Sequence, residues 1–86
     1  MEIKKKTRPE YFEKIVRGEK NVELRLADFK LNKGDTLILE EYNPKTKKYT
    51  GRIIKKKVKN VIKWNPTLTH SLDDIKKFGF YEIEME

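Results

Sequence analysis

Three charged side chains, Lys20, Glu23 and Arg25, stand close together in the sequence and could act on one ligand. A lysine amine can contact a phosphate, or attack as a nucleophile when burial or a neighbouring cation favours its neutral form. A glutamate can accept a hydrogen bond from a base amino group or serve as a general base. An arginine can make a forked contact with phosphate or carboxylate. The alternative to a ligand site is that the three side chains only form ion pairs with one another or with a neighbouring strand.

A strand over 22–26 is expected to carry two of these charges. Glu23 and Arg25 alternate with Val22, Leu24 and Leu26. Because successive side chains of a strand point to opposite faces, this pattern predicts that both charges point away from the apolar side. Lys20 would lie just before the strand, so the sequence predicts a polar site mounted on rigid elements.

A short helix is expected directly before this strand. Thr7, Pro9 and Glu10 fit a capping box in which Thr7 is the N-cap residue, and Gly18 suits the left-handed position after the last turn. The apolar residues of the segment fall on one helical face: Tyr11, Phe12, Ile15 and Val16.

The rest of the chain alternates between turns and β-rich runs. Gly34 and Asp35 predict a turn with a structural role, and Gly51 predicts a bulge or a bend. The alternation between Arg52 and Trp64 is imperfect, which also predicts a bulge or a sharp bend. A second short helix is expected over 71–78. The expected strands cover 2–6, 22–26, 36–42, 49–64 and 80–85.

The predicted order is therefore β-α-β-β-β-α-β in a single α+β domain spanning residues 1–86. So many strands in a short chain favour a small barrel, because closing a sheet removes its exposed edges. With no Cys and a single His, neither a metal site nor a cofactor is expected. No segment resembles a signal peptide or a membrane span, so we expect a cytoplasmic protein.

Charge suggests an anionic partner. The chain has 21 Lys and Arg against 14 Asp and Glu, a net charge of +7, and a basic domain is typical of nucleic-acid binding. Arg52, Lys55 and Lys57 belong to the densest basic run, and Trp64 is a candidate for base stacking. The alternative is a solvated surface, because a Lys- and Glu-rich composition without Gln or Cys is typical of hyperthermophile proteins.

The sequence resembles the ASCH domain, a branch of the PUA-like superfamily of small β-barrels. The resemblance rests on three motifs: Tyr11-Phe12-Glu13-Lys14-Ile15, Gly18-x-Lys20-x-Val22-Glu23-Leu24-Arg25 and Lys33-Gly34-Asp35-x-Leu37. It is closest to a small prokaryotic and phage subfamily, which has similar segments to 41–44 and 49–52. It also extends to the last strand, Gly79-Phe80-Tyr81-x-Ile83.

The resemblance implies a barrel of five to six mostly antiparallel strands and two short helices, with Lys20, Glu23 and Arg25 lining a cleft beside the first helix. It also implies RNA as the partner, since related PUA and YTH domains bind RNA. We therefore expect a monomeric RNA-binding module, in which the cleft holds a nucleotide and the basic strands contact phosphates.

Two other functions remain open. A similar bacterial branch hydrolyses N4-acetylcytidine with a lysine that matches Lys20, which would make this chain a small amidohydrolase of an acylated pyrimidine nucleoside. Lys20 and Glu23 would then be catalytic, although the threonine of that branch is Glu23 here. A protein-binding adaptor that uses the exposed sheet or the basic face is the other alternative.

Overall fold

A mixed sheet of five strands forms most of the described molecule, which comprises residues 1–64 and 79–86 of a computed structural model. The order of the strands in the sheet is β1-β3-β4-β5-β2. The elements are β1 (Glu2–Thr7), α1 (Pro9–Val16), β2 (Val22–Leu26), β3 (Thr36–Asn43), β4 (Lys48–Trp64) and β5 (Phe80–Met85). The predicted α+β class and the five predicted strands are confirmed, and the helix predicted over 71–78 lies outside the described residues.

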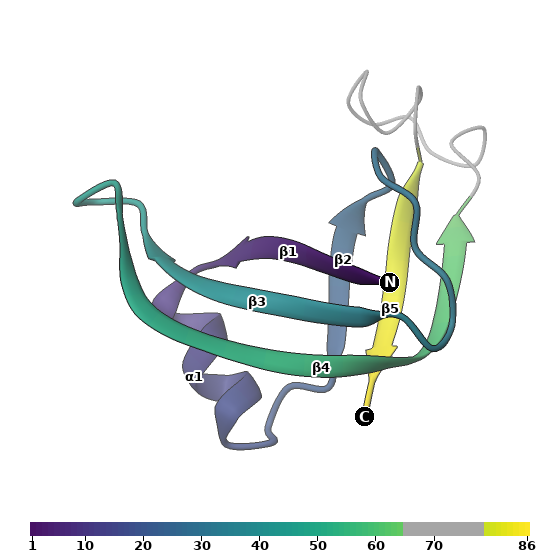
Figure 1. Cartoon of the computed structure of the whole chain (residues 1–86), viewed down its shortest axis with the longest axis horizontal. Coiled ribbons are helices and arrows are strands. Elements are labelled where there is room, and N and C mark those ends of the chain that lie inside the picture. The colour runs from purple at the N-terminus through teal and green to yellow at the C-terminus, as the bar shows by residue number, and fades with distance from the viewer. Residues whose placement is uncertain (65–78) are drawn as a thin grey trace.

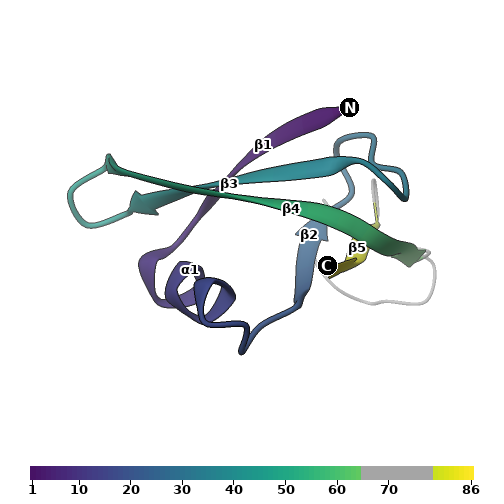
Figure 2. The same ribbon diagram turned by 60° about the horizontal axis from the view of Figure 1, so that its bottom comes forward.

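The long strand β4 joins the two halves of the sheet. Its first part pairs with β3 and its last part with β5, and the pairing register shifts between Val58 and Asn60. β4 curves from the half that contains β1 and β3 into the half that contains β5 and β2 (Figures 1 and 2). The irregularity predicted for this segment is therefore a bend within one strand, and the side chains facing the core change phase there.

The sheet is not closed. β1 pairs in parallel with β3, the other three strand pairs are antiparallel, and β1 and β2 are the two end strands. A barrel would need a hydrogen-bonded ladder between β1 and β2. The described strands contain no such ladder, so the predicted barrel is not confirmed, and the gap between β1 and β2 is called the seam below.

The core lies between the inner faces of both half-sheets and α1. Phe12 and Ile15 point inward from the helix and are almost fully buried, as are Leu37 and Leu39 of β3. Ile38 is also buried although it faces outward, because it lies in register between Lys4 and Lys55, whose long methylene stems can cover apolar surface. The centre of β3 is thus buried on both faces.

The start of α1 differs from the prediction. The N-cap residue is Arg8, with extended backbone angles and no side-chain cap, and Pro9 occupies the first turn. The predicted capping box is wrong because Thr7 is the buried last residue of β1 and its hydroxyl is bound elsewhere. The left-handed position of Gly18, with φ +77°, is confirmed.

The turn before β3 has the structural role that its sequence predicts. Gly34 has φ +91°, a left-handed conformation that L side chains rarely adopt. The backbone N–H of Asn32 donates to Oδ2 of Asp35 at 2.9 Å. This hydrogen bond holds the pKa of Asp35 below its ordinary value of 3.8 despite the opposing effect of desolvation, and the positive amino terminus nearby adds to the lowering.

Candidate functional site

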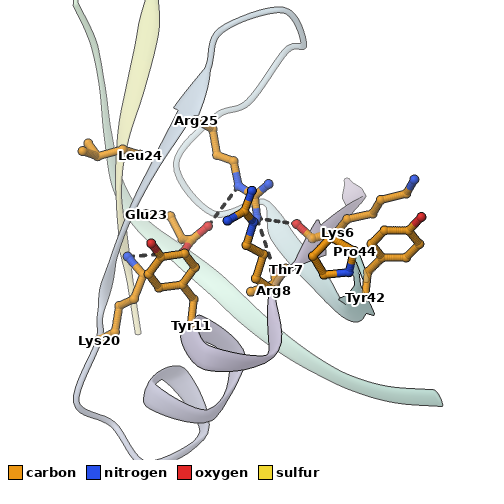
Figure 3. A pocket seen from close by; sticks show the side chains of 10 residues that line it. All are labelled: Lys6, Thr7, Arg8, Tyr11, Lys20, Glu23, Leu24, Arg25, Tyr42 and Pro44. Carbon is orange, nitrogen blue, oxygen red and sulfur yellow. Dashed lines mark hydrogen bonds and ion pairs between the residues drawn. The ribbon is translucent and has the colours of Figure 1, made fainter. Parts of the chain in front are cut away.

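A cleft lies at the seam, between the end of β1 and strand β2. Its volume is about 570 Å³. It is enclosed by residues of β1, α1, β2 and the end of β3, as Figure 3 shows. The lining residues are Lys6, Thr7, Arg8, Tyr11, Lys20, Glu23, Leu24, Arg25, Tyr42 and Pro44. The three side chains with which the sequence argument began are therefore brought together, and we call this space the seam cleft.

The charged side of β2 is its buried side. Glu23 is only 5% exposed, whereas Leu24 is 64% exposed and Val22 also faces solvent. The alternation is as expected, but the charged side of the strand faces inward. The strand can bury this side because its charges are paired with one another.

Glu23 is held between two cations. Its Oε2 lies 2.9 Å from Nε of Arg25, and its Oε1 lies 3.4 Å from Nζ of Lys20. The Lys20 ammonium also donates to the carbonyl oxygen of Val22. Both oxygens of this buried carboxylate are thus engaged, and the first effect of Glu23 is to fix the positions of Lys20 and Arg25.

Arg25 spans the seam. Its Nη2 donates to the carbonyl oxygen of Lys6 at 2.8 Å and to the hydroxyl of Thr7 at 3.1 Å, both on β1. One guanidinium therefore ties β2 to β1 where no backbone ladder does so, with Nε directed at Glu23 and Nη2 at β1 (Figure 3). The planar fork of arginine suits such a bridge, because its donors are fixed in different directions.

The cleft contains cations and aromatic rings that the sequence argument did not assign to it. Lys6 and Arg8 line it, and no salt bridge is recorded for either within 1–64 and 79–86. The Lys6 ammonium lies 4.4 Å from the ring centre of Tyr42. Tyr11, predicted to share one helical face with Phe12 and Ile15, lines the cleft and is half exposed, whereas the other two are buried. No local sequence pattern places Lys6 and Tyr42 in one site, because they are brought together by the parallel pairing of β1 with β3, which are distant in the sequence.

The other predicted nucleic-acid contacts lie outside the seam cleft. Arg52 contacts α1 and β3: its Nη1 is 3.1 Å from Glu13 and 3.8 Å from Glu41. Lys55 and Lys57 share the outer face of β4, on the opposite side from Arg52, and Lys55 pairs with Glu2 at 3.6 Å.

Trp64 is partly exposed at the end of β4 and is stacked on Phe80, with ring centres 6.1 Å apart. Of the seven predicted binding residues, only Lys20, Glu23 and Arg25 come together in the cleft.

Two further findings concern only the described residues. Within them, no group of three or more His, Cys, Asp or Glu side chains is placed to hold a metal ion. Their single helix is too short to span a membrane.

Known proteins match the chain in two ways. The crystal structure of hypothetical protein PH0355 has the same fold, with a TM-score of 0.72 and 24% sequence identity over 100% of this chain and 98% of that one. At this identity the likeness concerns the fold alone. No curated protein matches the sequence. A family model described as "Domain of unknown function (DUF3850)" matches residues 3–72, which include every residue of the seam cleft. The chain therefore belongs to the DUF3850 family.

Proposed function

We propose that the protein is a cytoplasmic RNA-binding module of ASCH type that holds one nucleotide in the seam cleft. The observation that carries the proposal is the composition of the cleft. Lys6, Arg8, Lys20 and Arg25 line it together with a single carboxylate, Glu23, which leaves a surplus of three positive charges. A surplus of fixed cations in a concave site favours an anionic ligand.

The geometry divides the cations into two groups. Lys20 and Arg25 are held by Glu23 and set the shape of the cleft. Lys6 and Arg8 have no recorded ion pair among the described residues and line the same space, so they are the cations available to a phosphate. Tyr11 adds a partly exposed aromatic ring, a surface on which an unpaired base can stack.

The outer face of the first half-sheet supports a longer nucleic-acid track. Lys4 and Lys6 of β1 alternate outward on the same side of the sheet as Lys55 and Lys57 of β4. In the proposed complex these lysines contact the phosphates that flank the bound nucleotide. Arg52 and Trp64 are not used, because the former is occupied with α1 and the latter lies outside the cleft.

Fluorescence anisotropy tests the proposal. Labelled single-stranded RNA, duplex RNA, tRNA and matching DNA are titrated at several salt concentrations with wild type, Lys6→Ala and Arg8→Ala. Lys33→Ala, an exposed lysine outside the cleft lining, removes the same charge and is the matched control. We expect each cleft variant to weaken binding of one RNA class by about tenfold, equivalent to about 1.4 kcal/mol.

The salt dependence separates specific binding from general attraction. Each lost phosphate contact reduces the slope of log affinity against log salt by about 0.7 for a single strand. Lys33→Ala should leave both affinity and slope close to wild type. If all four proteins bind every nucleic acid equally weakly with the same slope, the net charge acts non-specifically and the proposal is wrong.

A second candidate function follows from the Lys20–Glu23 pair. An amine and a buried carboxylate 3.4 Å apart at the wall of a cleft are suitable groups for hydrolysis of an acylated pyrimidine nucleoside. Incubation of concentrated protein with N4-acetylcytidine tests this function. Turnover that disappears in Lys20→Ala would support it, and an untouched substrate would exclude it.

A further inference from the structure

The free edge of β2 borders the seam cleft. β2 is an end strand and pairs only with β5 among the described strands. Just outside this ladder, the Met85 N–H donates to the carbonyl oxygen of Asn21, and the Ala27 N–H donates to the carbonyl oxygen of Gly79. These bonds fix which residues of β2 are hydrogen-bonded to β5.

The hydrogen-bonding sides of an antiparallel strand alternate from one residue to the next. Asn21 and Ala27 bond to β5, so Glu23 and Arg25 between them do so as well. The backbone N–H and C=O groups of Val22, Leu24 and Leu26 therefore point to the free edge.

Leu24 is the member of this set that lines the cleft. Its side chain points away from Glu23 and Arg25 (Figure 3) and is largely exposed, so its main chain is the part nearest to them. The Val22 carbonyl is already occupied by the Lys20 ammonium. The alternation directs the N–H and C=O of Leu24 away from β5, and within the described residues no turn or loop backbone group bonds to them. Leu24 thus offers one donor and one acceptor side by side at the wall of the cleft.

We propose that the main chain of Leu24 reads the base of the bound nucleotide by pairing with its Watson–Crick edge. This inference rests on the proposed RNA-binding function. Unpaired bases present adjacent donors and acceptors on that edge, and proteins recognise single-stranded RNA by contacting it. In uracil, the Leu24 carbonyl accepts the N3–H and the Leu24 N–H donates to a neighbouring carbonyl oxygen. A base in a duplex has no free Watson–Crick edge, so the site selects single-stranded RNA.

The same edge could in principle accept a peptide strand, but two observations favour a nucleotide. The Arg25 guanidinium crosses the seam to the Lys6 carbonyl, 2.8 Å away, and occupies the space that a strand running along β2 would need. The cleft also carries the surplus of positive charge described above, for which a neutral peptide backbone has no counterpart.

Proline at position 24 removes the proposed donor with little effect on the ladder. The N–H of Leu24 faces the free edge, a place where proline is tolerated in sheets. Leu24→Pro is compared with Leu24→Ala, which keeps the N–H. Val22→Pro removes an N–H of the same orientation from a residue outside the cleft lining.

The probes are three single-stranded heptanucleotides: oligouridine, the same oligomer with 3-methyluridine at every position, and an abasic oligomer with the same phosphates. We expect wild type, Leu24→Ala and Val22→Pro to bind oligouridine about tenfold more tightly than the other two probes. Leu24→Pro, which keeps the carbonyl but lacks the N–H, should lose most of this preference and bind oligouridine and the 3-methyluridine oligomer with similar affinity.

A second measurement does not depend on the folding of any variant. The amide proton of Leu24 in ¹⁵N-labelled wild type should exchange freely with solvent, then shift and become protected when oligouridine is added. The methylated probe should produce neither effect.

The outcomes separate this inference from the proposed function. If Lys6→Ala weakens binding while Leu24→Pro binds like wild type and the Leu24 amide is unchanged, the inference is wrong and the RNA-binding function stands. If wild type does not bind oligouridine or any other RNA, both are wrong. If Leu24→Pro fails to fold, the amide measurement alone decides.

Discussion

Arg25→Ala should destabilise the protein far more than the loss of a surface arginine. The Arg25 side chain is 23% exposed, and the Glu23 side chain with which it pairs is 6% exposed. Removing one partner of a fully buried ion pair costs about 3–5 kcal/mol, because the other charge remains buried without its counter-ion. Arg25 is partly exposed and Lys20 still contacts the carboxylate, so we expect a loss of about 2–3 kcal/mol, the two hydrogen bonds to β1 included.

Arg17→Ala is the matched control. Arg17 is 60% exposed, and it pairs with Glu13 at 3.6 Å and with Glu19 at 3.9 Å. Exposed pairs of this kind contribute about 0.5 kcal/mol or less. Arg25→Lys is a second comparison, since it keeps the positive charge but loses the fork that reaches Glu23 and β1 together.

Urea unfolding followed by circular dichroism measures both effects, and thermal unfolding provides a check. For a domain of this size, each kcal/mol corresponds to about 4–8 °C in Tm. Arg25→Ala should therefore melt about 10–20 °C below wild type, Arg17→Ala within a few degrees of it, and Arg25→Lys between the two. Equal free energies of unfolding for Arg25→Ala and Arg17→Ala would refute the role of Arg25 as the tie across the seam.

Three further changes test the fold around the site. Asp35→Asn should lose stability near neutral pH, because the hydrogen bond from Asn32 lowers the pKa of Asp35 in the folded protein. Ionised Asp35 therefore stabilises the fold at pH values above the pKa that it has in the unfolded chain. This contribution disappears as the pH falls through the pKa of Asp35 in the folded protein. Plots of Tm against pH for the two proteins should thus converge in acid, and a constant difference would contradict this. Tyr81→Phe removes the 2.7 Å hydrogen bond from the Tyr81 hydroxyl to the carbonyl of Phe29 and should cost about 1–2 kcal/mol in urea unfolding; an unchanged midpoint would contradict it. Leu39→Ala empties a fully buried position of β3 and should cost about 2–5 kcal/mol, so a loss below 1 kcal/mol would contradict the assigned core.

Local sequence patterns predicted the elements well. The helix, the turn at Gly34 and Asp35, and the irregular long strand each depend on residues close together in the chain. Even so, the helix cap was misassigned, because Thr7 has two possible partners. Its hydroxyl could cap the helix that follows or bind a residue distant in sequence, and the contact with Arg25 is the one observed.

The candidate site could be predicted only in part. The cluster of Lys20, Glu23 and Arg25 was visible in the sequence, but the face on which it lies was not. An alternating strand of two charges and three apolar residues can be buried on either face, and the choice depends on what the opposite strand offers. Here β1 offers the backbone carbonyl of Lys6. Every residue has such a carbonyl, so the residue type at position 6 does not indicate this contact.

The position of β2 in the sheet has a consequence for the order in which the site forms. All residues of the seam cleft lie between Lys6 and Pro44, yet among the described strands β2 is paired only with β5, the last of them in the sequence. A nascent chain that has emerged as far as β4 contains every cleft residue but lacks β5, the strand with which β2 forms its backbone ladder. We therefore expect the seam cleft to take its final shape only after β5 has been synthesised, and a chain shortened before Phe80 to lack this shape although no cleft residue is missing.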